Sequence, residues 1–296
     1  MDLRHLRYFL CVAEEMHFGR AAQRLGISQP PLSQQIRALE ETLGVRLFDR
    51  TSRRVRLTEA GELFLPEARQ TLAQADRAAQ VARRAHRGEI GRLRLGFTAS
   101  APFVPRVARA LYRFRQSHPQ VELELQELGR DAQIAQLEQG QLDIGIVRAF
   151  EQPALPLGMV SQCLLEEEMM LAMRKEHVLA RRAEDPAIAD LAGVPLVLYG
   201  VANGAGFNEH FFELCEEAGF RPSVALEVSS FATLLGLVAA GFGATVLARS
   251  LARLQVENVV QRRLASPVMS RLWTLHKQAL SPTAVAFKDA MAQAEG

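Results

Sequence analysis

The chain has 296 residues and a formal net charge of only +2, so its overall charge does not indicate wholesale coating of nucleic acid. This length suits two or three domains with buried cores. Cys11, Cys163 and Cys215 are far apart in the sequence, which favours a reducing compartment and buried apolar roles over disulfides. Because we find no secretory pattern and no apolar run of about 18 residues, we expect a cytoplasmic protein.

The charge is distributed unevenly along the chain. Residues 1–90 contain 15 arginines, no lysine and 11 acidic residues, a balance of +4, whereas the remainder has a balance of −2. A basic N-terminal part on a slightly acidic body predicts local contact with phosphate groups.

Residues 18–43 have the pattern of a helix, a tight turn and a second helix. We expect the first helix at residues 18–25 and its end at Gly26, because a residue without Cβ adopts the left-handed cap at least cost. The second helix should begin near Pro31 and end at Gly44, since proline is tolerated in a first helical turn. The residues predicted to face inward are Phe18, Ala21, Ala22 and Leu25 on the first helix, and Leu32, Ile36, Leu39 and Leu43 on the second.

The opposite face of the second helix is polar and can form hydrogen bonds with base edges or phosphates. A helix–turn–helix places such a helix in the major groove. An ordinary helical hairpin is the alternative. DNA binding is favoured because Gly26, the small residue Ala22 and the polar face agree in register. The residues predicted to contact DNA from this helix are Gln29, Pro30, Ser33, Gln34 and Arg37.

The segment after the second helix, residues 46–57, predicts a short hairpin. Its tip carries Arg53 and Arg54, as in a wing that contacts phosphates or a minor groove, although a solvated turn fits the same pattern. Before residue 18, apolar residues at helical spacing predict a third helix that covers the other two, through Leu3, Leu6, Leu10 and Ala13. Residues 1–57 are therefore predicted to form a winged helix–turn–helix domain.

Three collinear motifs carry a family resemblance: LRHLRYFLCVAEE, FGRAAQRLGISQPPLSQQIRALEETLGVRLFDR and VRLTEAG. They resemble the N-terminal domain of LysR-type transcriptional regulators, and the similarity continues more weakly to about residue 290. Within the family, LRHLRYF, SQPPLS, DIGIVR and LGLVAAG are similar to the branch that controls catabolism of aromatic acids through muconate-like intermediates. The resemblance implies a ligand-responsive regulator of promoter DNA that forms homodimers and, by extension, homotetramers.

Residues 58–90 are expected to form a long linking helix and a hinge. Small and apolar residues repeat in a heptad pattern that predicts pairing with the same helix of a second subunit, although packing against its own chain is the alternative. Pro66 interrupts the pattern and should kink the helix. The predicted seam comprises Leu65, Ala68, Leu72, Ala75, Ala79 and Ala82.

After residue 91, short apolar runs alternate with helical stretches, which predicts an α/β body with parallel sheets. The predicted strands are residues 93–98, 121–128, 142–147, 169–173, 195–199, 225–228, 244–247 and 272–277. The resemblance implies two Rossmann-like lobes of the periplasmic-binding-protein type II fold. Lobe I would comprise about residues 91–162 and 268–296, and lobe II about 163–267.

Ligands of such sheets bind beyond the carboxyl ends of strands, and three strand-to-helix turns qualify, at residues 98–102, 129–131 and 199–207. Arg130 and Arg148 could add charge for a carboxylate. By resemblance, Ser100, Arg130 and the loop from Asn203 to Phe207 match ligand-contacting positions. Family members that bind muconate have a small hydroxyl residue where this chain has Arg130, and a bulky cation there favours a smaller or more acidic effector.

Two alternatives concern charged residues of this body. Arg148 could instead pair with an acid such as Asp143 or Glu151, a common structural use of arginine. The run Glu166-Glu167-Glu168 is interpreted as a solvated charge run.

The sequence shows no motif for metal binding or for catalysis. The histidines are not paired at metal-ligand spacing, and there is no nucleophile elbow. We therefore expect no metal, no cofactor and no enzymatic activity. The competing hypothesis is an α/β enzyme or solute-binding protein whose N-terminal helices serve only oligomerisation.

Overall fold

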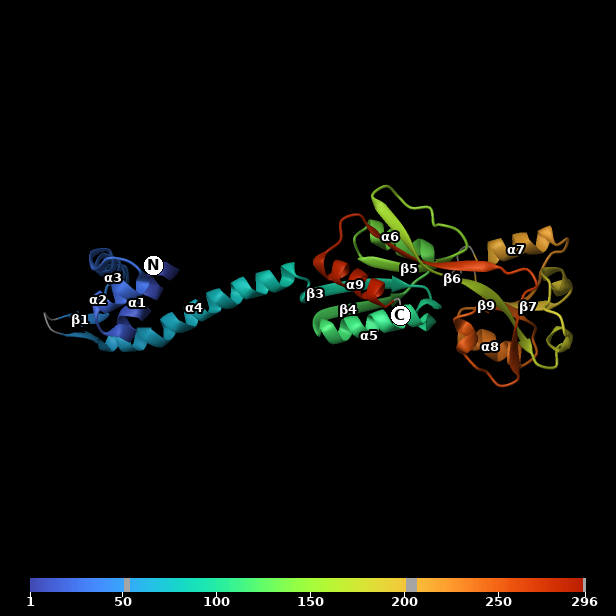
Figure 1. Cartoon of the computed structure of the whole chain (residues 1–296), viewed down its shortest axis with the longest axis horizontal. Helices are drawn as coiled ribbons and strands as arrows, with labels where there is room; N and C mark the ends of the chain where they lie inside the picture. The colour runs from blue at the N-terminus through green and yellow to red at the C-terminus, as the bar shows by residue number, and fades with distance from the viewer. Residues whose placement is uncertain (51–53, 201–206, 295–296) are drawn as a thin grey trace. The chain divides into compact units, whose positions relative to one another are not determined.

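The computed structural model describes residues 1–50, 54–200 and 207–294, and the chain divides into two compact units, Met1–Arg84 and Ala85–Gly296. In the N-terminal unit, three helices pack together and are followed by an antiparallel hairpin in which Phe48 lies opposite Leu57 (Figure 1). Its elements are α1 (Leu3–Glu15), α2 (Phe18–Leu25), α3 (Gln29–Leu43), β1 (Phe48–Arg50), β2 (Val55–Leu57) and α4 (Glu59–His86). The predicted winged helix–turn–helix fold is confirmed.

The glycine stops of the two central helices are also confirmed. Gly26 and Gly44 cap α2 and α3 with φ angles of 67° and 71°, in the left-handed region that favours glycine. Helix α3 begins at Gln29, two residues earlier than predicted, because extended Ser28 precedes it and Pro30 is tolerated in the first turn.

The core of this unit agrees with the predicted stripes of the three helices except at one residue of α1: Leu6 is buried and Leu10 and Ala13 pack against the core, but Leu3 does not. Phe9 is fully buried on α1, whereas Leu3 is 41% exposed. Phe9, which is not part of the predicted stripe, belongs to the core because its ring packs between those of Phe48 and Phe64, at centroid distances of 5.3 and 5.0 Å. The buried residues of α2 and α3 are Phe18, Ala21, Ala22, Leu32, Ile36 and Leu39.

Helix α4 continues past its internal proline, and its predicted seam has two different environments. Leu65, Ala68 and Leu72 pack against the core of the N-terminal unit, so this half of the seam is covered by its own domain. That corrects the expectation of one continuous seam between subunits. Ala79 and Ala82 are exposed and leave the second half uncovered.

The C-terminal unit is a mixed α/β body, which confirms the predicted fold class. Its strands are β3 (Ile90–Phe97), β4 (Gln120–Glu127), β5 (Ile144–Ala149), β6 (Met159–Arg174), β7 (Pro195–Tyr199), β8 (Ser223–Val228), β9 (Thr245–Ala248), β10 (Val259–Arg263) and β11 (Met269–Lys277). Its helices are α5 (Pro105–Ser117), α6 (Arg130–Glu138), α7 (Phe207–Glu217), α8 (Phe231–Ala239) and α9 (Pro282–Gln293). Short 3₁₀ turns are η1 (Ala101–Phe103), η2 (Val178–Arg181), η3 (Ile188–Leu191) and η4 (Leu251–Arg253).

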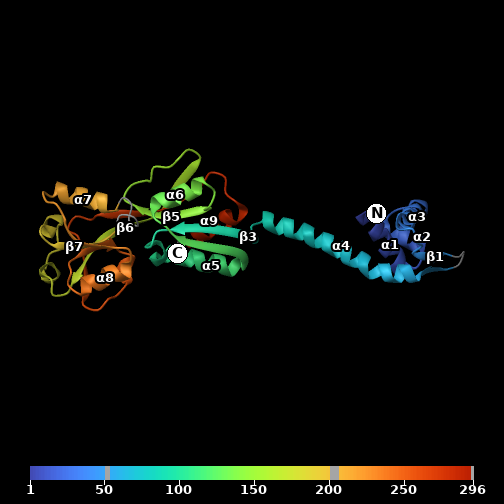
Figure 2. The ribbon, with the colours of Figure 1, turned by 180° about the vertical axis from the view of Figure 1, so that it is seen from behind.

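Helices cover both faces of the sheets in this unit. Helices α5 and α9 pack on one face of the sheet around β3 and β5, and α6 packs on the other (Figures 1 and 2). Helix α7 packs in one apolar cluster beside β7 and β9, and α8 packs in a second one. The unit therefore contains several separate apolar cores instead of a single large one.

The strand directions differ from the parallel sheets that the sequence predicts. Strands β3, β4 and β5 are parallel, as are β7 and β8, but β6 and β11 run antiparallel to their neighbours. The main sheet has the order β10-β6-β11-β5-β3-β4, and β9 also pairs with β6. The long strand β6 explains the difference, because its first part pairs with β11 and its second part pairs with β9 and β10. Sequence analysis places only residues 169–173 in this strand and misses β10, since polar residues interrupt both apolar patterns.

Candidate functional site

The exposed face of α3 carries the residues that the sequence predicts to contact DNA. Gln29, Pro30, Gln34 and Arg37 are exposed and Ser33 is half-buried, while the opposite face of the helix lies on the core. The helix therefore presents amide, hydroxyl and guanidinium groups together, which is the set that reads base edges and phosphates. In the wing, Arg54 is exposed just before β2, and Arg53 lies outside the described residues.

One carboxylate joins α3 to the base of the wing. Glu40 Oε1 accepts hydrogen bonds from the backbone amides of Leu47 and Phe48 at 2.9 and 3.1 Å. Its Oε2 accepts from Arg50 Nη2 at 2.7 Å, and the Arg50 guanidinium lies 4.7 Å from the centre of the Phe18 ring. Burial lowers the pKa of Arg50, and Glu40 opposes that shift. Sequence analysis does not identify this positioning role of Glu40, because its partners come from a later part of the chain.

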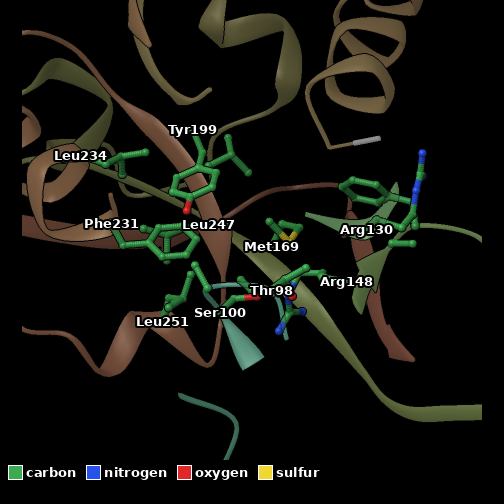
Figure 3. A pocket seen from close by; sticks show the side chains of 15 residues that line it. Thr98, Ser100, Arg130, Arg148, Met169, Tyr199, Phe231, Leu234, Leu247 and Leu251 are labelled. Carbon is green, nitrogen blue, oxygen red and sulfur yellow. Dashed lines mark hydrogen bonds between the residues drawn. The ribbon is translucent and has the colours of Figure 1, made fainter. Parts of the chain in front are cut away.

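A cavity in the C-terminal unit lies where several strands end (Figure 3). The space between its side chains, including the part open to solvent, is about 690 Å³. The described residues that line it are mostly apolar: Thr98, Ala99, Ser100, Arg130, Arg148, Ala149, Phe150, Met169, Tyr199, Phe231, Leu234, Val246, Leu247, Ala248 and Leu251.

Arg148, at the end of β5, is the centre of a polar cluster in the wall of this cavity. Its Nε donates to Ser100 Oγ at 2.9 Å, and its Nη1 donates to Ser270 Oγ at 3.0 Å. Its Nη2 lies 2.7 Å from Glu167 Oε1, and the two side chains are only 11% and 9% exposed. Burial lowers the pKa of Arg148, and the charge of Glu167 opposes that shift.

Glu167 is itself held at both of its oxygens. Ser250 donates its backbone amide to Oε2 at 2.7 Å and its hydroxyl to Oε1 at 2.8 Å. The interpretation of residues 166–168 as a solvated charge run is therefore wrong for Glu167. Arg148 therefore pairs with Glu167 and with neither of the two acids that the sequence suggested. One of those two, Asp143, pairs with Arg94 instead.

The opposite wall of the cavity is aromatic. The Tyr199 and Phe231 rings stack at a centroid distance of 4.6 Å and an interplanar angle of 17°. The Tyr199 hydroxyl donates to Glu127 at 3.5 Å, and burial, together with the Glu127 charge, raises the pKa of Tyr199, so the hydroxyl is neutral. Neither Tyr199 nor Phe231 is among the predicted ligand-contacting residues, although Tyr199 begins one of the predicted turns.

The structure brings together some of the predicted effector residues and separates others. Ser100 and Arg148 are in direct contact, whereas the Arg130 guanidinium pairs with Asp131 at 2.8 Å and points away from them in Figure 3. Asn203 lies outside the described residues. Phe207 is the first residue of α7.

Thr98 lines the cavity and carries a buried polar atom. Its Oγ1 is buried and has no hydrogen-bond partner among the described residues.

Other kinds of site find little support in the described part of the chain. It contains no group of three or more His, Cys, Asp or Glu side chains placed to hold a metal ion. None of its helices combines the length and the apolar character needed to cross a membrane. Cys11 and Cys215 are buried as predicted, and burial raises the pKa of Cys215 to about 11, but Cys163 is exposed, contrary to expectation.

Comparison with known proteins places this architecture in a family. A model of the LysR substrate binding domain matches residues 86–295, and a model of the bacterial regulatory helix-turn-helix protein, lysR family, matches residues 3–62. The chain is 42% identical over 293 residues to the uncharacterized HTH-type transcriptional regulator YnfL of Escherichia coli (strain K12), covering 97% of each. It is 38% identical over 278 residues to the HTH-type transcriptional regulator AlsR of Bacillus subtilis (strain 168), covering 93% of this chain and 89% of AlsR.

Solved structures agree with these matches. Full-length CbnR, a LysR family transcriptional regulator complexed with its target DNA, has a TM-score of 0.82 and 28% identity, covering 99% of both chains. The winged helix–turn–helix, the α/β body and both family models together show that the chain belongs to the LysR family of DNA-binding transcriptional regulators.

Proposed function

We propose that this regulator senses a small organic acid, either an aromatic acid or a dicarboxylate, in the cavity of its C-terminal unit. The observation that carries the proposal is the cavity, whose lining combines Ser100, Arg130 and Arg148 with mostly apolar side chains. A few placed polar groups in an apolar pocket are typical of small-molecule sites. We propose that the C-terminal unit has two arrangements, to which the effector binds with different affinity. Binding would therefore shift the equilibrium toward the arrangement with the higher affinity. The proposal includes the assignment of this chain to the branch of the family that controls the catabolism of aromatic acids.

The DNA contact that we propose uses α3 and the wing. Gln29, Pro30, Ser33, Gln34 and Arg37 would face the major groove, and Arg53 and Arg54 would contact the flanking backbone or minor groove. The exposure of the α3 residues and of Arg54 supports this assignment. Because it binds promoter DNA, the regulator is expected to act in the cytoplasm.

A dimer held by α4 is the proposed unit of binding, extended to a tetramer through the C-terminal units. The uncovered positions Ala79 and Ala82 support it, because an apolar stripe on a long exposed helix gains most when a second helix covers it. Two recognition helices would then read two half-sites of the operator.

Two measurements test the proposal. Fluorescence anisotropy with promoter DNA from beside the gene should show binding stronger than to random DNA. A thermal-shift screen of aromatic and dicarboxylic acids should reveal a stabilising ligand that also changes the DNA affinity. If the protein binds promoter DNA and random DNA equally, the alternative of an α/β enzyme or solute-binding protein would be favoured. The proposed regulator has no metal, cofactor or catalytic site.

A further inference from the structure

We infer that a hollow between the second half of α3 and strand β1 binds a phosphate group of the DNA backbone, held by the guanidinium groups of Arg37 and Arg46. The inference rests on the proposed DNA contact of α3 and the wing, and it adds a binding site to that contact, because Arg46 is not among the residues assigned to DNA above. The charged residues that line the hollow are Arg37, Glu40, Glu41, Arg46 and Arg50.

The hollow continues the face of α3 that carries the proposed base contacts. Arg37 is exposed one turn after Gln34, and it belongs both to that face and to the lining of the hollow. In the proposed complex α3 lies in the major groove and the wing contacts the adjacent minor groove or its backbone. A phosphate backbone separates adjacent grooves of DNA. It therefore has to pass between α3 and the wing, into which β1 leads from the hollow.

Two unpaired arginines give the hollow its affinity for an anion. Arg37 and Arg46 are exposed, and neither side chain has an ion pair or a hydrogen bond among the described residues. Burial lowers the pKa of Arg50, Glu40 opposes that shift, and the charges of Arg37 and Arg46 lower it further, so both lie close enough to act on Arg50. A phosphate beside these guanidinium groups would offset their repulsion and accept their hydrogen bonds.

The acids of the lining do not cancel this charge. Glu40 accepts from Arg50 Nη2 at 2.7 Å and from two backbone amides, so this pair is neutral and already engaged. Glu41 is exposed and has no ion pair among the described residues. Three arginines and two glutamates leave the lining with a net charge of +1. Glu41 therefore opposes the binding of a phosphate, which provides a test of opposite sign.

The salt dependence of DNA binding by the full-length chain tests this inference, because each phosphate contact contributes about 0.9 to the slope of log K against log salt concentration. We expect Arg46→Gln to reduce the size of that slope by about 0.9 for each subunit bound. It should also weaken binding to promoter DNA and to random DNA by the same factor, about threefold to tenfold at about 0.1 M salt, because a phosphate contact reads no sequence.

Arg77→Gln is the matched control. Arg77 is exposed on α4, more than one turn beyond Leu72, which packs against the core of the unit. The substitution removes the same charge outside the hollow and should keep the wild-type slope. Glu41→Gln is the second variant, and it should strengthen binding to both DNAs by about twofold or more. The melting temperature verifies that each variant is folded.

An unchanged slope in Arg46→Gln, or an equal change in Arg77→Gln, would overturn the phosphate contact. A loss of affinity confined to promoter DNA would assign Arg46 to base reading and overturn it as well. Weaker or unchanged DNA binding by Glu41→Gln would contradict the role of charge in the hollow. In these cases the wild type still prefers promoter DNA and the regulator function stands, whereas a wild type without that preference would contradict the proposed function instead.

Discussion

Gln34 is exposed on α3, on the face opposite the buried stripe. Its amide can donate to and accept from one base edge, whereas it contributes little to phosphate attraction. We expect Gln34→Ala to weaken operator binding by about 1–3 kcal/mol and to leave binding of random DNA nearly unchanged. Anisotropy at one fixed salt concentration measures both affinities. Equal loss on the two DNAs would show that Gln34 does not read a base.

Glu40 tests how the wing is attached to the recognition helix. Removing its carboxylate leaves the amides of Leu47 and Phe48 and the guanidinium of Arg50 without their acceptor. We expect Glu40→Ala to favour local opening by about 2 kcal/mol, or about thirtyfold faster hydrogen exchange at these two amides. Glu41→Ala, at the exposed neighbouring position, is the control and should change exchange little. Wild-type exchange rates in Glu40→Ala would contradict this attachment.

At the scale of elements, His276 links β11 to α9. It is 4% exposed, its Nε2 lies 3.2 Å from Lys288 Nζ, and its Nδ1 lies 2.7 Å from the Lys277 carbonyl oxygen. Burial lowers the pKa of His276, the Lys288 charge lowers it further, and the hydrogen bond with the carbonyl opposes them. The folded chain therefore disfavours the imidazolium.

This shift determines the sign of a pH dependence. Between the ordinary histidine value of about 6.5 and the lower folded pKa, the unfolded chain binds more protons, so stability decreases as the pH falls through that window. We expect the melting temperature to decrease from pH of about 7.5 to about 5.5, and His276→Gln to reduce that decrease. Part of the decrease should persist in the variant, because burial also lowers the pKa of His177. An identical pH profile in His276→Gln would show that His276 does not contribute.

At the scale of the whole molecule, the second half of α4 is the proposed contact between subunits. A charge at Ala79 would lie unpaired in a dimer seam, and the same charge at Leu72 would also disturb the core of its own domain. We expect Ala79→Glu to shift the mass from light scattering toward the monomer and to weaken operator binding, because one recognition helix contacts only half a site. Gln80→Glu, exposed on another side of the helix, is the control. A dimeric Ala79→Glu would place the contact elsewhere.

The local features of this protein follow from its sequence. Gly26 and Gly44 end the two central helices because only a residue without Cβ adopts their backbone angles without strain. The stripe of Leu32, Ile36 and Leu39 is buried because helical periodicity places those side chains on one face, and the polar face follows by exclusion. These signals lie within a few turns of one helix, so no knowledge of distant contacts is needed.

The partner of Arg148 was decided only by the tertiary structure. Asp143 and Glu151 are nearer in sequence, yet Glu167 is the acid that pairs with it. Strand β11 lies between β5 and β6, with Leu272 opposite Arg148 and Ser270 opposite Glu167, so the two charges meet across an intervening strand. Strand order and antiparallel register arise from packing between segments more than a hundred residues apart, and no local period encodes them.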